Sequence, residues 1–121
     1  MSRIESVELV DSERVVPYGD ARVTWLVRKG DGWVRATQWP GATTAARDAG
    51  PGTVWERAVT LALVAGTELV RVESRPRIEA PKDPLSYLDR RGARPRTTRR
   101  TLYRVEVGGR VRALSDARSR Q

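Results

Sequence analysis

The sequence predicts an α+β fold rich in β-strands: an antiparallel sheet of hairpins, about five to seven strands, with one helix near 53–65 and a short helix near 84–91. Two observations predict the sheet. Apolar and polar residues alternate along several short segments, and turns that contain glycine separate these segments. Helix-like punctuation around residues 53–66 predicts the longer helix. The alternative is a mainly β fold in which residues 54–74 form one more hairpin.

The most regular alternation lies in residues 23–39 and predicts a hairpin. Asp31-Gly32 separates two alternating runs, and an Asp-Gly step in this position is typical of a two-residue turn. With this turn, Val27 lies opposite Ala36. One face of the hairpin then belongs to the core, and it carries Val23, Trp25, Val27, Val34 and Ala36.

The opposite face of this hairpin is a candidate second binding patch. In the predicted register Arg28 lies directly across from Arg35, and like charges that face each other destabilise a sheet. An anionic partner would relieve this repulsion. In the second interpretation both arginines extend into water, while Trp33 and Trp39 cover a second layer of the core. We favour the second interpretation because two exposed Trp side chains are costly without a partner.

Several other segments have the composition of strands. A turn at residues 11–13 separates the first two of them, and Gly108-Gly109 joins the last two into a closing hairpin because glycine accepts the positive φ angles of a tight turn. Residues 44–48, which are rich in alanine, are a candidate for one turn of helix. The predicted strands are 4–10, 14–18, 68–74, 101–107 and 110–114.

Residues 53–65 carry conflicting signals. Thr53 and Glu56 have the spacing of a capping box, and Gly66 stands where a helix would end. Against a helix, β-branched residues are frequent in the segment and its apolar residues alternate from 59 to 63. We prefer the helix and keep the hairpin as the alternative.

We expect residues 1–114 to form a single globular domain. Residues 76–98 contain four prolines and are predicted to be an irregular loop within it, rich in proline and arginine. Inside the loop, Asp83 would cap the short helix at 84–91. Residues 115–121 are expected to fray.

The chain of 121 residues contains neither cysteine nor histidine. Disulfides and thiolate metal sites are therefore excluded, and the commonest metal ligand and general base are missing. We expect no cofactor and no metal. No apolar run approaches the roughly 20 residues of a membrane span, and the first residues do not resemble a signal peptide. We expect a cytoplasmic protein that does not enter a membrane.

The sequence predicts no catalytic centre. Paired carboxylates could hydrolyse glycosides or hold magnesium, but no spacing fixes two of the acids on one face beside an apolar cleft, which is typical of solvated surface acids. Neither a nucleophile-elbow nor a Walker pattern occurs. The chain is therefore predicted to be a binding protein and not an enzyme. The carboxylates considered are Glu56, Glu68, Glu73 and Asp83.

The net charge of +8 is confined to one end of the chain. Residues 1–89 contain 12 Lys and Arg against 13 Asp and Glu, a net charge of −1, whereas residues 90–121 contain 11 Arg against two acids, a net charge of +9. A one-sided positive field attracts polyanions and accelerates their capture.

Nine arginines of this C-terminal segment form the candidate nucleic-acid site. Phosphates would exchange their counterions for guanidinium groups, and Tyr87 and Tyr103 are candidates to stack on bases. The arginines are Arg90, Arg91, Arg94, Arg96, Arg99, Arg100, Arg104, Arg110 and Arg112.

No known DNA- or RNA-binding motif accompanies these arginines, so the predicted function is binding to the phosphate backbone of DNA or RNA with little sequence specificity. The alternative partner is a protein. In that case the chain would be an inhibitor, an adaptor or a subunit of a larger assembly that docks through its Trp and Arg surfaces, because these residues are enriched at protein interfaces.

Overall fold

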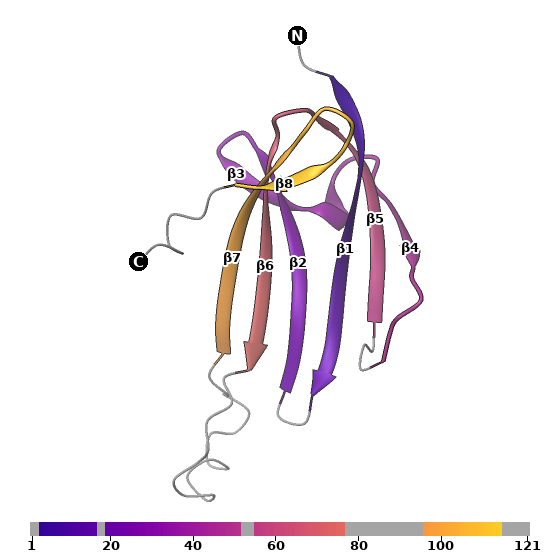
Figure 1. Ribbon diagram of the computed structural model, residues 1–121, viewed down its shortest axis with the longest axis vertical. Coiled ribbons are helices and arrows are strands. Elements are labelled where there is room, and N and C mark those ends of the chain that lie inside the picture. Colours follow the sequence, from indigo (N-terminus) through magenta and orange to yellow (C-terminus); the bar gives the residue numbers. More distant parts are fainter. Residues whose placement is uncertain (1–2, 17–18, 52–54, 77–95, 115–121) are drawn as a thin grey trace, which may run out of the picture.

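The computed structural model describes residues 3–16, 19–51, 55–76 and 96–114, and most of them lie in one antiparallel sheet (Figure 1). A short 3-10 helix, η1 (Ala36–Gln38), follows the third strand. The strands are β1 (Ile4–Val16), β2 (Gly19–Lys29), β3 (Gly32–Arg35), β4 (Thr43–Ala46), β5 (Trp55–Val64), β6 (Glu68–Pro76), β7 (Arg96–Val105) and β8 (Val111–Ala113).

The predicted helix near 53–65 is wrong. Residues 55–64 form β5, which pairs with β1 from Ile4 opposite Val64 to Glu13 opposite Trp55. Its buried side chains recur at every second residue, as in a strand, so pairing with a distant segment overrides the local helix signals. The described part of the chain contains no α-helix, so the predicted α+β class is also wrong and the fold is mainly β. Residues 54–74 do not form a hairpin either, because β5 pairs with β1 and β4 while β6 pairs with β2 and β7.

Two other local predictions are also wrong. The turn expected at residues 11–13 is absent, because β1 continues through these residues and remains paired with β5. The helical turn expected at 44–48 is replaced by β4, which lies beside β5 at the end of the sheet. The short helix expected at 84–91 lies outside the described residues.

The β2–β3 hairpin forms, but its turn lies one residue earlier than predicted. Arg28 lies opposite Trp33 and Val27 opposite Val34, so Gly30 and Asp31 make the turn. Gly30 has a φ of 61°, a conformation that glycine adopts without strain. The expected pairing of Arg28 with Arg35 is therefore wrong.

The side of the β2–β3 hairpin predicted to be core does face the core. Trp25, Val27 and Ala36 are buried, Val23 packs against them, and Val34 is half-buried. The shift of the turn leaves Val34 on the same face as Val27, because opposite residues share a face of the sheet.

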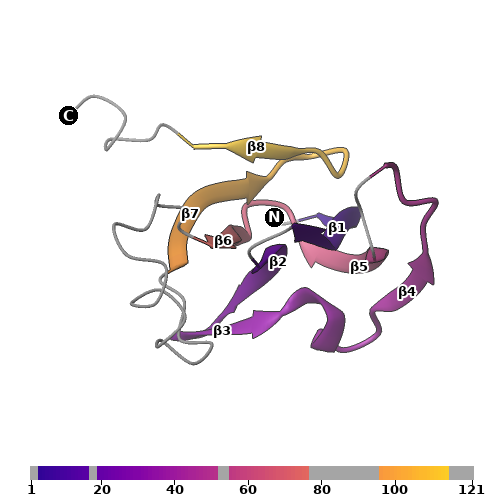
Figure 2. The ribbon, with the colours of Figure 1, turned by 90° about the horizontal axis from the view of Figure 1, so that it is seen from below.

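The sheet curls around a single apolar core (Figure 2). Its strands follow the order β4-β5-β1-β2-β6-β7-β8, and β3 pairs with β2 outside this path. The β6–β7 ladder extends one rung into the loop before β6, because Gly66 donates a hydrogen bond to the Val105 carbonyl and Val105 donates one to the Thr67 carbonyl, at N···O distances of 2.7 and 2.9 Å. The buried core residues are Val7, Leu9, Trp25, Val27, Ala36, Val59, Leu61, Leu63, Leu69 and Val105.

Strands β1 and β2 separate above their shared hairpin. Their ladder runs only between Ser12 opposite Val23 and Val16 opposite Gly19. At the point of separation the Trp25 amide donates a hydrogen bond of 3.1 Å to Oδ1 of Asp11. A buried side chain thus satisfies an amide that the ladder leaves unpaired.

Candidate functional site

Strand alternation divides the predicted arginine cluster between the two faces of the sheet. On β7, Arg99 lies on the same face as Tyr103, whereas Arg100 and Arg104 lie on the opposite face. Arg112 is on β8, directly opposite Arg104. Arg110 follows the turn between β7 and β8, and Arg96 begins β7. The other predicted site residues, Arg90, Arg91, Arg94 and Tyr87, lie outside the described residues.

Five arginines from β2, β3, β7 and β8 share one face of the sheet, and β6 lies between β2 and β7 without adding an arginine to this set. Arg35 lies opposite Leu26, Leu26 opposite Val70, and Val70 opposite Leu102. Residues two positions away from these on their own strands have the same orientation. The predicted C-terminal cluster and the predicted second patch thus lie in part on the same face of the sheet, the outer side of its curl, with β3 and β8 at opposite ends of the curl (Figure 2). We call the surface formed by Arg28, Arg35, Arg100, Arg104 and Arg112 the arginine face.

The arginine face carries more positive than negative charge, and all five of its arginine side chains are exposed. Glu68 lies opposite Arg104, and Arg112 Nη1 is 3.6 Å from Oε2 of Glu106. An ion pair this exposed contributes little to stability. Arg104 of β7 and Arg112 of β8 lie opposite each other on adjacent strands, and this pairing of like charges is unfavourable by itself.

The two tryptophans of the predicted second patch have different environments. Trp33 is 38% exposed, and the Arg28 guanidinium lies 5.2 Å from the centre of its ring. Trp39 packs against the core, and the Lys29 ammonium lies 5.8 Å from its ring. Trp33 is thus available to a partner on the arginine face.

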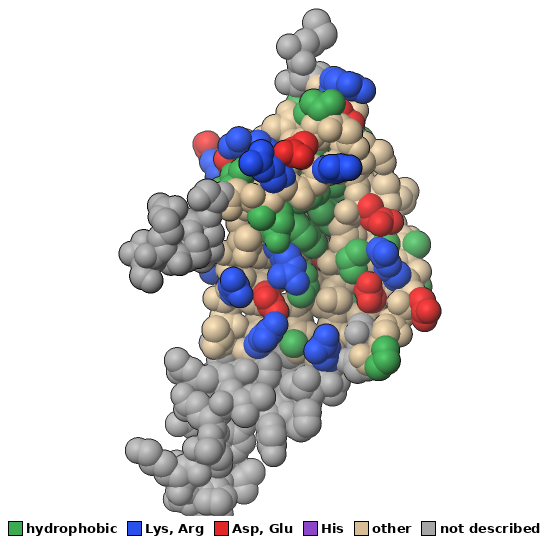
Figure 3. All heavy atoms as spheres, in the orientation of Figure 1, with side chains coloured by type: hydrophobic (Ala, Val, Ile, Leu, Met, Phe, Trp, Pro, Cys, Tyr) green, Lys and Arg blue, Asp and Glu red, His purple; other side chains and the backbone are tan. Residues whose placement is uncertain are grey.

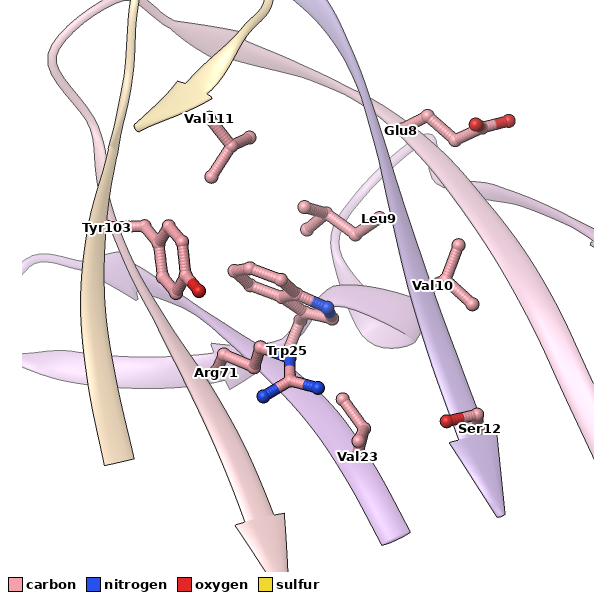
Figure 4. Close-up of a pocket in the computed structure, with 9 residues that line it drawn as sticks. All are labelled: Glu8, Leu9, Val10, Ser12, Val23, Trp25, Arg71, Tyr103 and Val111. Atoms are coloured by element: carbon pink, nitrogen blue, oxygen red, sulfur yellow. The ribbon is translucent and has the colours of Figure 1, made fainter. Parts of the chain in front are cut away.

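The opposite surface of β2, β6 and β7, which we call the inner face, contains a pocket of about 400 Å³. Its aromatic wall consists of Trp25 and Tyr103, whose ring centres are 4.9 Å apart at an angle of 58°. Figure 4 shows these side chains together with the rest of the lining. The lining residues are Glu8, Leu9, Val10, Ser12, Val23, Trp25, Arg71, Tyr103 and Val111.

An arginine held by an ion pair forms one side of the pocket. Arg71 lies opposite Trp25, and its Nη1 is 3.4 Å from Oε1 of Glu73. Arg75 also donates to Glu73, through Nε at 2.8 Å and through Nη2. These hydrogen bonds lower the pKa of Glu73 below its usual value, and the bond from Arg75 has the largest effect. Two arginines thus share one carboxylate, and this part of the inner face remains positively charged.

Figure 3 views the inner face. Hydrophobic side chains gather in the middle of the sheet, and Lys, Arg and a few acidic side chains lie around them. Of the two predicted stacking residues, Tyr103 lines the pocket. Sequence reasoning assigned Trp25 to the core and did not single out Arg71. No local signal could have identified them as neighbours of Tyr103, because the pocket is assembled from β1, β2, β6, β7 and β8.

Two carboxylates of β1, Asp11 and Glu5, are buried, and each contacts a group of the protein itself. Burial raises the pKa of Asp11, although the Trp25 amide and the nearby Arg57 and Arg35 act in the opposite direction. Glu5 has an oxygen, Oε2, that is buried without a hydrogen bond and lies 3.5 Å from Nε of Arg3.

The described residues contain no cluster of three or more acidic side chains able to hold a metal ion, and no helix among them is long and apolar enough to cross a bilayer. The carboxylates considered as a catalytic pair are not gathered into a site. On β5, Oε2 of Glu56 lies 3.8 Å from Nε of Arg47. On β6, Glu68 is the first residue and Glu73 forms its ion pairs with Arg71 and Arg75. Asp83 lies outside the described residues.

No protein family model, curated protein or solved structure matches this chain.

Proposed function

We propose that this protein binds the phosphate backbone of nucleic acid through the arginine face. The observation that supports this function is the strand register, which places five exposed arginines from four strands on the same face of the curled sheet. A guanidinium group stays charged at all accessible pH values and forms paired hydrogen bonds with phosphate oxygens. Binding would release the counterions of the phosphates and reduce the repulsion between Arg104 and Arg112.

The size of the arginine face suits a contact with several phosphates. Neighbouring strands are about 4.8 Å apart, so the path along the curled sheet from β3 to β8 is about 19 Å. Figure 2 shows these two strands on opposite sides of the molecule, so a polyanion that contacts all five arginines has to follow the outside of the curl. A DNA duplex carries about one negative charge per 1.7 Å of its axis, and a single strand carries one at every nucleotide. The face is a sheet surface without a helix to enter the major groove, so it would bind with low sequence specificity.

A variant that removes charge from the arginine face tests this function. We expect the triple variant Arg100→Ala, Arg104→Ala, Arg112→Ala to lose at least about tenfold in affinity for a labelled DNA duplex or single strand, measured by fluorescence anisotropy. The plot of log affinity against log salt between about 50 and 200 mM should also become shallower by two to three, because each lost phosphate contact removes about 0.9 from the slope.

The matched control removes three arginines that lie outside the arginine face: Arg14→Ala, Arg75→Ala, Arg99→Ala. Arg14 lies opposite Ala21 of β2, which has the orientation of Trp25, and Arg75 and Arg99 lie beside Glu73. The control has the same net charge as the triple variant, so the two differ only in which arginines are removed. If binding depends on the position of the charges, the control should retain affinity within about threefold of the wild type. A thermal melt by circular dichroism establishes that both variants are folded. Equal losses of affinity in the two variants would mean that net charge alone attracts the polyanion, and unchanged affinity in the first would refute the proposed site.

A protein partner is the second candidate, and the exposed Trp33 and Leu102 favour it. Leu102 is 39% exposed and lies on the arginine face, where Trp33 is also accessible. Aromatic and arginine side chains together are typical of the centres of protein interfaces. If Trp33→Ala abolishes capture of a partner while salt has little effect on that complex, the same surface serves protein binding instead.

A further inference from the structure

The pocket of the inner face lies on the opposite side of the sheet from the arginine face. Its residues come from strands that the curl of the sheet brings together, and Val111 of β8 and Leu9 of β1 lie on its two sides (Figure 4). A volume of about 400 Å³ is within the range of small-molecule sites. The proposed nucleic-acid contact uses none of the residues that line it.

The walls of the pocket combine aromatic and aliphatic surface. Trp25 and Tyr103 contact each other at a tilted angle, and Leu9, Val23 and Val111 add apolar surface around them. Flat rings pack favourably against such walls, through dispersion and through edge-to-face contacts with the aromatic groups. The walls therefore suit a planar ring better than a flexible polar chain.

Arg71 supplies the charge at this site. In Figure 4 its guanidinium lies beside Trp25 at one end of the pocket, while the Glu8 carboxylate points away from the other lining side chains. Glu8 accepts a hydrogen bond of 3.4 Å from Arg47, on the far side of β1. Arg71 contacts Glu73 through one nitrogen at 3.4 Å, and a guanidinium has five N–H donors, so donors remain for an anionic ligand.

We propose that the inner-face pocket binds a small planar-ring anion, whose ring packs on Trp25 and Tyr103 and whose carboxylate or phosphate pairs with Arg71. Glu73 is a positioning residue, because it holds the Arg71 guanidinium from the side of Arg75. Ser12 provides a hydroxyl at the lower edge of the same site. The proposal is independent of nucleic-acid binding.

Two anionic probes and their neutral counterparts test the proposal by isothermal titration calorimetry. Indole-3-acetate carries a carboxylate and adenosine monophosphate a phosphate, whereas indole-3-ethanol and adenosine carry the same rings without charge. We expect at least one anionic probe to bind with a dissociation constant below about 1 mM, and at least about tenfold more tightly than its neutral counterpart. Preference for one anion identifies the source of the ligand as a carboxylate or a nucleotide.

A pair of variants separates a specific contact from general attraction. Arg71→Gln should weaken the anionic probe by about tenfold or more and leave the neutral probe unchanged, while Arg104→Gln, which removes the same charge from the opposite face of the sheet, should leave both unchanged. Equal weakening by both variants would overturn the proposed contact, since it would indicate attraction by net charge.

Nuclear magnetic resonance locates the ligand. The indole N–H signals of the tryptophans can be assigned with single Trp→Phe variants, and the probe should shift the signal of Trp25 but not that of the exposed Trp33. Shifts confined to Trp33, or no binding of any of the four probes at millimolar concentration, would refute the pocket as a site for planar-ring anions. The triple arginine-face variant should bind the anionic probe as the wild type does, so this site and the proposed nucleic-acid site can fail separately.

Discussion

Asp11 lies where β1 and β2 separate, and its carboxylate accepts the hydrogen bond of the Trp25 amide in place of a backbone carbonyl. Because burial raises its pKa above 3.8, the folded protein holds the Asp11 proton more tightly than the unfolded chain does. The contribution of this group to stability is therefore greatest below pH 3.8 and is lost as the pH rises through the raised pKa. The hydrogen bond to Trp25 is needed at every pH, but the charge is not.

This difference predicts opposite effects for two substitutions at Asp11. Asp11→Asn keeps an oxygen that accepts from Trp25, so its free energy of unfolding at pH 7 should equal or exceed that of the wild type, and the two should converge near pH 3. Asp11→Ala leaves the buried amide unpaired and should cost about 1–3 kcal/mol at both pH values. Urea unfolding at the two pH values measures this. A clear loss in the Asn variant at pH 7 would mean that attraction to Arg57 and Arg35 outweighs burial.

Gly109 is constrained both by its backbone conformation and by the curl of the sheet. It has a φ of 89°, and an added Cβ would lie 2.4 Å from the Ser6 carbonyl oxygen on β1. Gly108, beside it, has a φ of 101° but open space around its Cα. We expect Gly108→Ala to cost about 1–2 kcal/mol from the positive φ alone. Gly109→Ala should cost about 1–3 kcal/mol more, because backbone must move. Equal costs in denaturant melts would contradict the close approach.

At the scale of elements, the β2–β3 turn offers a test of register. Gly30 has a positive φ and Gly32 does not, and the nearest atom to a Cβ at Gly32 is the Lys29 carbonyl oxygen at 3.9 Å. Gly30→Ala should therefore lower the free energy of unfolding by about 1–2 kcal/mol. Gly32→Ala should change it by less than about 0.5 kcal/mol. The turn that the sequence predicts, at Asp31 and Gly32, would reverse this order.

Those elements also show which parts of the fold can be predicted from sequence. Trp25 and Val27 alternate with more polar residues and thereby identify the core face of β2. A strand with one buried face has apolar residues at every second position, so this signal is present in the strand's own sequence. The segment of β5 shows the limit. In the sequence, Thr53, Glu56 and Gly66 resemble helix boundaries, and pairing of β5 with β1, some fifty residues earlier in the chain, decides for a strand. The β-branched residues and the alternation from 59 to 63 are local signals for a strand, but the strand with which the segment pairs leaves no local signal.

At the scale of the whole molecule, composition predicts the charge of the candidate site but not its position. The excess of arginine after residue 90 is evident in the sequence, yet alternation along β7 sends Arg99 to one face and Arg100 to the other. Which face collects Arg28 and Arg35 depends on the order of strands across the sheet. The pocket depends on the same order, since Arg71 and Tyr103 meet only after β6 and β7 have paired.

The concentration of charge on one face also predicts how salt affects the stability of the whole fold. Directly opposed residues such as Arg104 and Arg112 are about 5 Å apart, well within the screening length of about 10 Å at 0.1 M salt. The midpoint of thermal unfolding should therefore rise as sodium chloride increases from low concentration, because salt reduces self-repulsion in a chain of net charge +8. Removing Arg100, Arg104 and Arg112 should flatten this dependence more than removing Arg14, Arg75 and Arg99, two of which lie around the Glu73 carboxylate. Differential scanning calorimetry of the three proteins measures the slopes, and identical slopes in the two variants would show that the face exerts no repulsion beyond that of the net charge.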